Sequence, residues 1–567
     1  MQGITFPAEG GGGRAAPPNT GQLLRQKNCL QNLQTERIYV MAKRTINLDM
    51  TACDNREMRI GSITSWDGSA SELVAASNYE ERGKGEKKKG CSGGKGKLCQ
   101  LCELHMPFSQ QTMCANAIVG CQIGNITDCI LIDHGPIGCS ANHARFNLGY
   151  KMGLIRRGKP VENLRIFSTN LKERDMVFGA SDRLRQTIQD AYDRYHPKAI
   201  FISMSCSTAI IGEDIDSVAD EKEAELGIPI VPLHCEGFRS KHWSTGFDIS
   251  QHGVVRQIVK RNPVKQPDLI NIVALWGTDY FTEILKPLGL RVNYMIDMAS
   301  YDELAQASEA VATATFCHTL GSYMATALEE HFGVPQIDAP QPYGIAATDE
   351  WLRAIARLVG KEQETEAYIQ SEHERIAPRL AQLREELKGL NGFVMTGSSY
   401  AHGLISVLRE LGLGVEGSIV FHHDPVYDSG HEHQNTLKYL VDTYGDVPHF
   451  TVSKTQPFQL YAILNRVKTD FVIIRHNGLA PVAAKLGIPA LAMGDEHFPV
   501  GYDGIIRVGE ILLDIVARKK FNQVLARHTE LGYTNWWLSQ EDPFILARKP
   551  ELLDEPIHEE NGGRYDG

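Results

Sequence analysis

Short apolar runs alternate with amphipathic segments along most of the chain after residue 129. Continuous apolar strands separated by helices are typical of parallel sheets that helices cover on both faces. We expect strands at residues 130–132, 199–203, 228–233, 270–275, 292–296, 392–395, 471–474 and 505–508. We expect helices at residues 181–195, 322–332, 348–387 and 398–411. The pattern therefore predicts an α/β fold with doubly wound parallel sheets.

Two loop-like seams divide the predicted strands into three groups. Residues 261–267 contain two prolines and residues 388–392 contain two glycines, and a predicted strand follows each seam directly. Residues 1–105, with a run of four glycines and a Lys/Gly-rich stretch, show no clear core of their own. The segments that we expect are an N-terminal extension, three Rossmann-like units and a C-terminal tail, at residues 1–105, 106–265, 266–390, 391–545 and 546–567.

Composition and charge exclude several classes of function. The 567 residues are 42% hydrophobic and 22% charged, which is typical of an ordinary globular protein. The formal net charge of -11 argues against a nucleic-acid partner. No apolar window reaches membrane-spanning length and no signal peptide is evident, so we expect a cytoplasmic protein without a membrane partner. No glycine-rich phosphate motif stands at a strand–helix junction, which argues against a dinucleotide or ATP site.

All 12 cysteines lie within the first 317 residues. In a reducing cytosol they are expected to serve in metal binding, catalysis or packing. Cys99 and Cys102, with Cys91 and His105 nearby, are compatible with a zinc or iron–sulfur knuckle, although no second Cys-x-x-Cys pair accompanies them.

Three of the cysteines, Cys114, Cys139 and Cys206, lie in separate turns of the first predicted unit, and two of these turns follow strands. Ligands of open α/β sheets bind at the carboxyl ends of strands. Three thiolates from separate turns suit a bridging iron–sulfur cluster at an interface better than a self-contained zinc site, although simple packing is the alternative for each cysteine. Packing is favoured for Cys121, Cys129 and Cys235.

Several motifs together resemble the α-type subunit of nitrogenase component 1, in order from about Cys114 to about Arg518. They are Met-Cys at 113–114, His-Gly-Pro-Ile-Gly-Cys at 134–139, and the segments 171–179, 205–215 and 235–239. The resemblance implies three Rossmann-like domains, a homologous β-type subunit in an α2β2 heterotetramer, and a homodimeric ATP-dependent iron protein as electron donor. It also implies that Cys114, Cys139 and Cys206 hold a P-cluster-type iron–sulfur cluster at the subunit interface.

The same resemblance implies a second, catalytic iron–sulfur cofactor that is held by one cysteine and one histidine. The cysteine matches Cys317, which follows an apolar strand. Gly494 stands where the family has its histidine, and we expect His497, three residues later, to serve instead. Rival histidines at strand ends are His422, His423 and His476.

Five positions depart from the family pattern near this cofactor. Phe247 and Trp243 match a histidine and a glutamine beside its reactive face. Asn147, Gln122 and Gly478 match an arginine, a valine and the lysine that holds homocitrate. Because a buried anion without a partner is costly, the loss of that lysine favours an iron-only cofactor without homocitrate.

These departures favour a larger, partly apolar substrate, since aromatic faces contact thioether sulfur well. The chain is therefore most similar to the methylthio-alkane reductases, which cleave small thioethers such as dimethyl sulfide to methanethiol and a hydrocarbon. Candidate proton donors are His143, His242, His318 and His497.

Two other functions stay open at this stage. One is an alternative-type nitrogenase subunit, and the other is a cofactor-assembly scaffold that holds a cluster precursor without turnover. Tetrapyrrole reductases of this superfamily lack the second cluster, so Cys317 argues against them.

Overall fold

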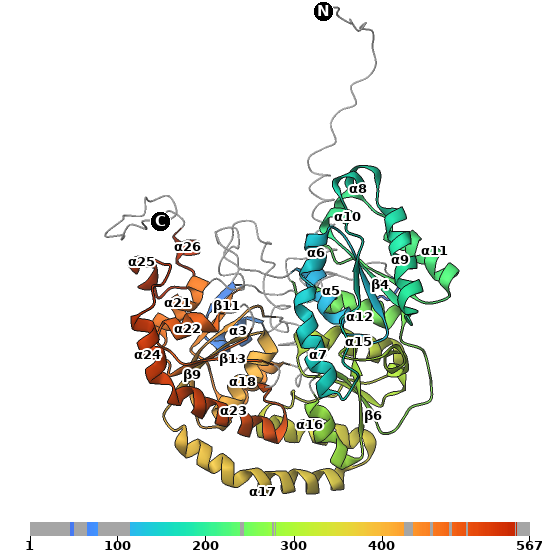
Figure 1. Ribbon diagram of the computed structural model, residues 1–567. Coiled ribbons are helices and arrows are strands. Elements are labelled where there is room, and N and C mark those ends of the chain that lie inside the picture. Colours follow the sequence, from blue (N-terminus) through green and yellow to red (C-terminus); the bar gives the residue numbers. More distant parts are fainter. Residues whose placement is uncertain are drawn as a thin grey trace, which may run out of the picture. The chain divides into compact units, whose positions relative to one another are not determined.

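The computed structural model describes the larger part of the chain, and the described residues form one compact unit. The described residues are 46–49, 65–77, 114–238, 243–274, 277, 279–423, 435–453, 457–475, 479–494, 497–549 and 552. They fold into three sheets that are almost wholly parallel and are flanked by helices (Figure 1). The α/β fold class predicted from the sequence is confirmed.

In the first sheet, alternate side chains of each buried strand point to opposite faces and pack against different helices. Its parallel order is β3 (Ile166–Ser168), β2 (Ile130–His134), β4 (Ile200–Met204) and β5 (Ile230–Leu233). Ile130 and Ile132 pack with helices α9 (Ser181–Tyr195) and α11 (Ile215–Leu226) on one face. Leu131 and Phe201 belong to the core cluster that contains α5 (Ala115–Ile123) and α12 (Thr245–Gln257).

The other two sheets follow in chain order. The second has the parallel order β7 (Arg291–Met295), β6 (Leu269–Val273) and β8 (Ala312–Thr315). The third has the order β1 (Ser65–Gly68), β11 (His449–Ser453), β10 (Gly414–Val420), β9 (Asn391–Thr396), β12 (Phe471–Ile474) and β13 (Ala490–Ala492), with only β1 antiparallel among these strands.

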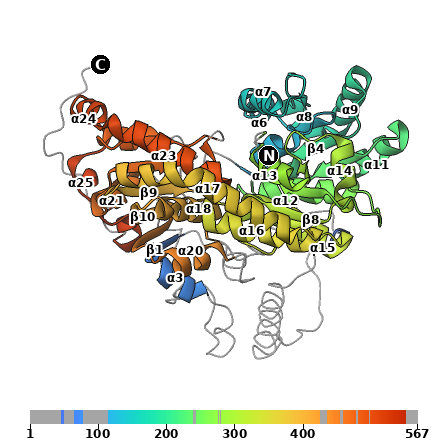
Figure 2. The ribbon, with the colours of Figure 1, turned by 90° about the horizontal axis from the view of Figure 1, so that it is seen from below.

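Helices cover and connect these sheets, and Figure 2 shows α16 and α17 lying side by side. The main remaining helices are α3 (Ala70–Ser77), α6 (Ile137–Ala141), α7 (Asn147–Arg156), α8 (Glu173–Phe178), α10 (Cys206–Ile211), α13 (Tyr280–Leu285), α14 (Tyr301–Ala305), α15 (His318–Phe332), α16 (Gly344–Val359), α17 (Glu362–Glu386), α18 (Ser398–Glu410), α20 (Thr436–Tyr444), α21 (Pro457–Arg466), α22 (Ala480–Lys485), α23 (Gly501–Ala517), α24 (Lys519–Arg527), α25 (Asn535–Leu538) and α26 (Ile545–Arg548).

Two predicted elements are wrong. The expected strand at 505–508 lies inside helix α23, where Ile505, Val508 and Leu512 are buried with helical spacing. A four-residue apolar run is compatible with either structure when its neighbours are ignored. The single helix expected at 348–387 is two helices, because Gly360 adopts a left-handed conformation (φ 67°) between α16 and α17.

Part of the predicted N-terminal extension belongs to the folded unit. Strand β1 pairs with β11, and Trp66, Ala70 and Leu73 are buried. Arg466 and Arg548 both bind the carboxylate of Asp67, at 2.7 and 2.9 Å. Residues 65–77 therefore pack on the third sheet, although the sequence shows no core of their own.

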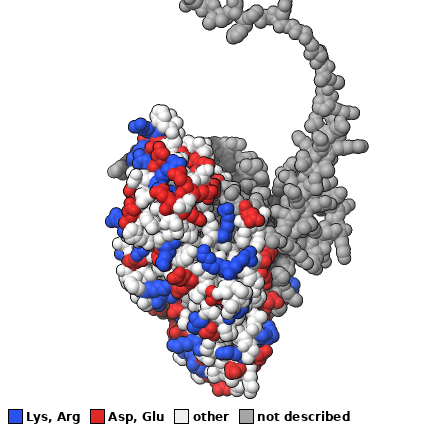
Figure 3. Space-filling view, turned by 90° about the vertical axis from the view of Figure 1, so that its right-hand side faces the viewer, with Lys and Arg blue, Asp and Glu red and all other residues white. Residues whose placement is uncertain are grey.

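One buried cluster contains residues of all three sheets, among them Leu131, Ile270 and Val394. The proposed domain limits stay a prediction. Within the described residues, no helix is both long enough and apolar enough to cross a bilayer. On the face drawn in Figure 3, acidic and basic side chains are interspersed.

Candidate functional site

Three cysteines from separate elements gather at one place, which we call the three-cysteine site: Cys114, Cys139 and Cys206. Cys114 precedes helix α5, Cys139 lies in α6, and Cys206 begins α10. Cys114 and Cys206 lie beside Gly237, whose backbone N–H donates to the Cys206 Sγ at 3.1 Å, and Cys139 is close enough to both for their charges to affect its pKa. A Cβ atom at this glycine would lie 3.2 Å from the Cys114 Cβ and 3.4 Å from the Cys206 Sγ. A side chain at position 237 would therefore crowd Cys114 and Cys206.

The surroundings of Cys139 favour the protonated form of its thiol. Burial, Asp133 and the other two cysteines raise the pKa of Cys139 to about 11. Cys114 is exposed, and Cys139 and Cys206 are half-buried. Cysteine thiolates are the usual ligands of iron–sulfur clusters. Within the described part of the chain, no group of three or more His, Cys, Asp or Glu side chains is placed so that it could hold a single metal ion.

The remaining described cysteines lie in the core, as the sequence favoured. Cys121, Cys129 and Cys235 are buried, and burial raises the pKa of Cys129 and Cys235 well above the usual thiol value. Cys91, Cys99 and Cys102 lie outside the described residues.

Large apolar side chains are exposed around the three-cysteine site, and we call them the apolar rim. Its members are Ile137 (57% exposed), Val177 (75%), Phe178 (80%), Ile210 (71%) and Phe238 (74%). They belong to α6, α8, α10 and the loop next to Gly237, and α8 contacts α10. Exposed apolar groups in such number on one surface are typical of a protein–protein contact.

Cys317 lies at a second place, directly before the first turn of helix α15. Its side chain is 9% exposed, and its Sγ lies 3.4 Å from the Ser399 Oγ. The backbone N–H of His318 donates to the same Ser399 oxygen at 3.1 Å. A helix N-terminus stabilises negative charge, so this position suits a thiolate that binds a metal.

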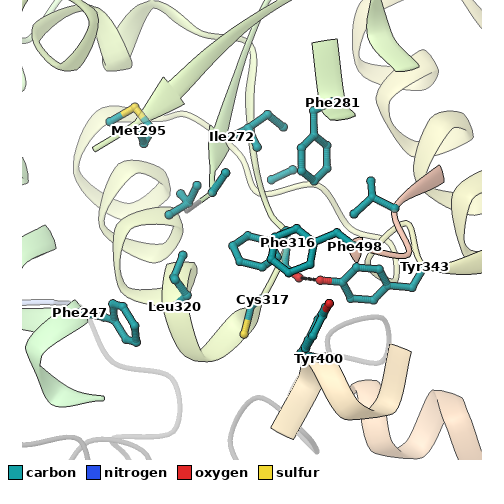
Figure 4. Packing of buried hydrophobic residues seen from close by; sticks show 14 of the residues in the cluster. Phe247, Ile272, Phe281, Met295, Phe316, Cys317, Leu320, Tyr343, Tyr400 and Phe498 are labelled. Atoms are coloured by element: carbon teal, nitrogen blue, oxygen red, sulfur yellow. Dashed lines mark hydrogen bonds between the residues drawn. The ribbon is translucent and has the colours of Figure 1, made fainter. Parts of the chain in front are cut away.

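An aromatic wall stands beside Cys317, formed by Phe316, Tyr343, Tyr400 and Phe498 (Figure 4). The ring centroids of Phe316 and Phe498 are 5.1 Å apart, and those of Tyr400 and Phe498 are 5.2 Å apart. The Arg475 guanidinium lies 4.7 Å from the Phe498 ring centroid. Burial and the nearby Cys317 raise the pKa of Tyr343, which therefore keeps its proton and donates to the Phe316 carbonyl.

The predicted pocket aromatics lie on the other side of Cys317. Figure 4 shows Phe247 and Leu320 there, within the same buried cluster. Trp243 is half-buried against this cluster and meets Phe247 edge to face, with centroids 6.0 Å apart. Phe247 is 6% exposed and packs in the core, and its phenyl ring has no proton to donate.

The predicted histidines occupy different places. His497 is half-buried, and its Nδ1 accepts a hydrogen bond from the Gly494 N–H at 3.0 Å. In a neutral ring with that bond, the proton resides on Nε2, so binding of a metal there requires the other tautomer. His318 is half-buried in the first turn of α15, beside Cys317.

His143 lies by the three-cysteine site instead, where its Nε2 is 3.1 Å from the Asn116 Oδ1. His422 and His423 are buried at the end of β10, and the His423 Nε2 is 2.8 Å from the Ser77 Oγ. His242, His476 and Gly478 lie outside the described residues.

Sequence reasoning missed several residues that the fold brings to these two places. Gly237 was noticed only as part of a motif, and Ser399, Tyr343 and Arg475 were not singled out. Ser399 lies 82 residues from Cys317 in the chain, so no local pattern could have paired them.

The family described as nitrogenase component 1 type oxidoreductase matches residues 114–516, a span that begins at the first cysteine of the three-cysteine site. This chain belongs to that family. The nitrogenase molybdenum-iron protein alpha chain of Methanosarcina barkeri is 28% identical over 378 residues, which are 64% of this chain and 70% of that one. The nitrogenase iron-molybdenum cofactor biosynthesis protein NifE of Rippkaea orientalis is 29% identical over 445 residues, which are 75% of this chain and 88% of that one.

Among solved structures, the one titled "Nitrogenase Cp1 at pH 5" is similar to this chain, with a TM-score of 0.64 and a sequence identity of 24%. The match covers 76% of this chain and 91% of that one. This likeness supports the fold. The relatives of this nitrogenase component 1 protein thus include alpha chains and NifE proteins at nearly equal identity. The chain is a nitrogenase-like alpha-type subunit or a NifE-like scaffold.

Proposed function

We propose that this chain is the catalytic α-type subunit of a nitrogenase-like reductase that cleaves the carbon–sulfur bond of small methylthio-alkanes. For dimethyl sulfide, two electrons and two protons break one C–S bond, and the products are methane and methanethiol. The observation that carries the proposal is the edge-to-face contact of Trp243 with Phe247. Figure 4 shows Phe247 on the side of Cys317 that lies opposite the aromatic wall. Aromatic rings bind methyl groups and thioether sulfur, and they exclude water from the reacting bond.

The three-cysteine site supplies the first part of this machinery. We assign Cys114, Cys139 and Cys206 as ligands of a P-cluster-type iron–sulfur cluster, which would relay electrons when bound. Three thiols leave the cluster open to further ligands, and the apolar rim offers a surface for the β-type subunit that would provide them. An ATP-dependent homodimeric iron protein would deliver the electrons to an α2β2 assembly.

Cys317 and a histidine, for which we propose His497, would hold a complex iron–sulfur cofactor at the second place. That cofactor supplies reducing electrons at the substrate when bound. We propose that it is iron-only and lacks homocitrate, because position 478 carries a glycine and not a lysine. The helix α15 N-terminus would stabilise the thiolate, and Tyr343 and Ser399 would fix the loop that carries it.

Two protons must reach the substrate during each cleavage. His318 is adjacent to Cys317 in the chain and half-buried, so we propose it as the nearest donor. His143, which bonds Asn116, serves the three-cysteine site better than the substrate.

The proposed activity is tested with the purified complex, its iron protein, ATP, a reductant and dimethyl sulfide. We expect methane and methanethiol in equal amounts, measured by gas chromatography, with methane absent when ATP is left out. Reduction of acetylene or dinitrogen without release of methanethiol would contradict the proposal. A Phe247→His variant serves as the specificity control, since it should lower the ratio of dimethyl sulfide cleavage to acetylene reduction.

A NifE-like scaffold is the second candidate, and the match to the Rippkaea orientalis protein over 88% of its length favours it. A scaffold carries a cluster precursor and passes it on once, whereas a catalytic subunit turns over many times. The number of methane molecules released per α-type subunit in the assay above separates the two functions. More than one methane per subunit requires repeated turnover and excludes a scaffold.

Replacement of His497 by alanine should lower the iron content of the complex, because the cofactor would lose one of its two protein ligands. The Tyr502→Phe variant is a suitable control, since it removes a buried hydroxyl that bonds Asp349 at 2.6 Å without touching the proposed ligands. Iron per complex and the spectrum of the reduced state are the measurements. An unchanged iron content in His497→Ala would show that another histidine, such as His476, binds the cofactor.

A further inference from the structure

Asp133 is a fully buried carboxylate at the carboxyl end of strand β2. Burial of a charged carboxylate is costly unless hydrogen bonds satisfy its oxygens. Within the described residues the structure records no lysine or arginine paired with it. Its bonding partners are polar side chains, so the position of this group depends on where those side chains lie.

Three neutral donors bind the carboxylate, and each comes from a segment that carries one cysteine of the three-cysteine site. Asn116 Nδ2 and Ser203 Oγ both donate to Asp133 Oδ1 at 3.1 Å. Ser140 Oγ donates to Oδ2 at 2.6 Å. Asn116 lies two residues after the first cysteine of the site, Ser140 lies one residue after the second, and Ser203 lies three residues before the third.

Asp133 and its three donors, which we call the Asp133 hub, therefore link helix α5, helix α6 and strand β4 through one side chain. We propose that Asp133 is a positioning residue that holds the three cysteine-bearing segments in register, so that their thiols are ready for a cluster. This inference rests on the proposed role of the three-cysteine site. Prior ordering of ligand segments strengthens metal binding, because the bound state then costs less conformational entropy.

His143 extends the hub by one step. Its Nε2 lies 3.1 Å from the Asn116 Oδ1, on the amide whose NH2 group faces Asp133. A ring N–H donating to that oxygen fixes which way the amide points. His143 packs against helix α5 at Gly120, where an added Cβ would lie 2.5 Å from the ring. The role of His143 in this arrangement is to orient Asn116.

The Asp133→Asn variant tests the hub. The new side chain keeps the shape but replaces one acceptor oxygen with a donor, so it cannot accept from all three segments. The variant is best made in a complex that also carries Cys317→Ala, where the iron that remains reports on the three-cysteine site alone. We expect it to lose this iron to a chelator about tenfold faster, in line with the usual effect of removing partners behind metal ligands.

A matched control is Asn271→Ala, because Asn271 is equally buried but lies in β6 and donates to the Ala307 carbonyl at 2.8 Å. It should lower the melting temperature of the complex without changing iron loss or the electron paramagnetic resonance line shape of the cluster. Asp133→Asn should change both. If that variant does not fold, the double variant Ser140→Ala, Ser203→Ala keeps the carboxylate and removes two of its donors, and the same iron loss is expected.

The outcomes separate the two levels of the proposal. A Cys317→Ala complex that retains Asp133 but holds no iron overturns both the cluster site and the hub. A complex that holds iron and loses it at the same rate, with the same line shape, after Asp133→Asn overturns the hub alone.

Discussion

Replacement of Cys317 by alanine is expected to abolish the release of methane from dimethyl sulfide, by a factor on the order of 100 or more. The side chain lies directly before helix α15, and no other described cysteine shares the aromatic wall around it. Its loss would remove the thiolate that holds the catalytic cofactor. Methane by gas chromatography and iron per complex are the measurements, and both should fall.

The matched control for this variant is Ser399→Ala. It removes the hydroxyl that contacts the Cys317 Sγ at 3.4 Å and keeps the proposed ligand. Its activity should fall much less, because the thiolate remains. The relay cluster should keep its spectrum in both variants. Full methane release by Cys317→Ala would place the catalytic cofactor elsewhere in the complex.

Replacement of Cys206 by alanine should remove electron delivery while the catalytic cofactor stays bound. Cys206 begins helix α10 and accepts a hydrogen bond from Gly237, so the substitution removes a thiolate from the centre of the three-cysteine site. Reduction that depends on the iron protein and ATP should be lost. The spectral signature of the relay cluster should be lost with it.

Cys129→Ala controls for the general cost of removing a cysteine from this part of the fold. Cys129 is buried directly before β2. It is not adjacent in the sequence to any of the three predicted cluster ligands. The substitution should leave a small cavity that lowers the free energy of unfolding. The iron content and the activity of the complex should stay unchanged. Equal activity of Cys206→Ala and Cys129→Ala would count against a relay cluster at this site.

Seven of the expected strands are present, because strands that are buried on both faces form continuous apolar runs. Shorter or more polar parallel strands such as β3, β11 and β13 were not predicted. The apolar run at 505–508 was wrongly predicted as a strand because its residues form part of the buried side of helix α23. Strand β1 escaped prediction because its residues Ser65–Gly68 include only one large apolar side chain, and its pairing partner β11 lies far along the chain.

Positions of the proposed ligands were partly predictable, since strand ends point to where ligands bind in open sheets. The meeting of Cys114 and Cys206 beside Gly237 agrees with that expectation, while their role as ligands stays a prediction. The Asp133 hub was out of reach, because its three donors are separated from it by 17, 7 and 70 residues. Contacts at those separations follow from topology and leave no local pattern.

Strand β1 has a practical consequence for work with this protein. A chain trimmed to the span that matches the family, residues 114–516, would lack both β1 and the arginine at 548 that binds Asp67. The backbone groups of β11 that now pair with β1 would then form an open sheet edge. Open edges recruit strands from other molecules and promote aggregation. Residues on either side of the family span thus cover an edge of β11 that a trimmed chain would expose.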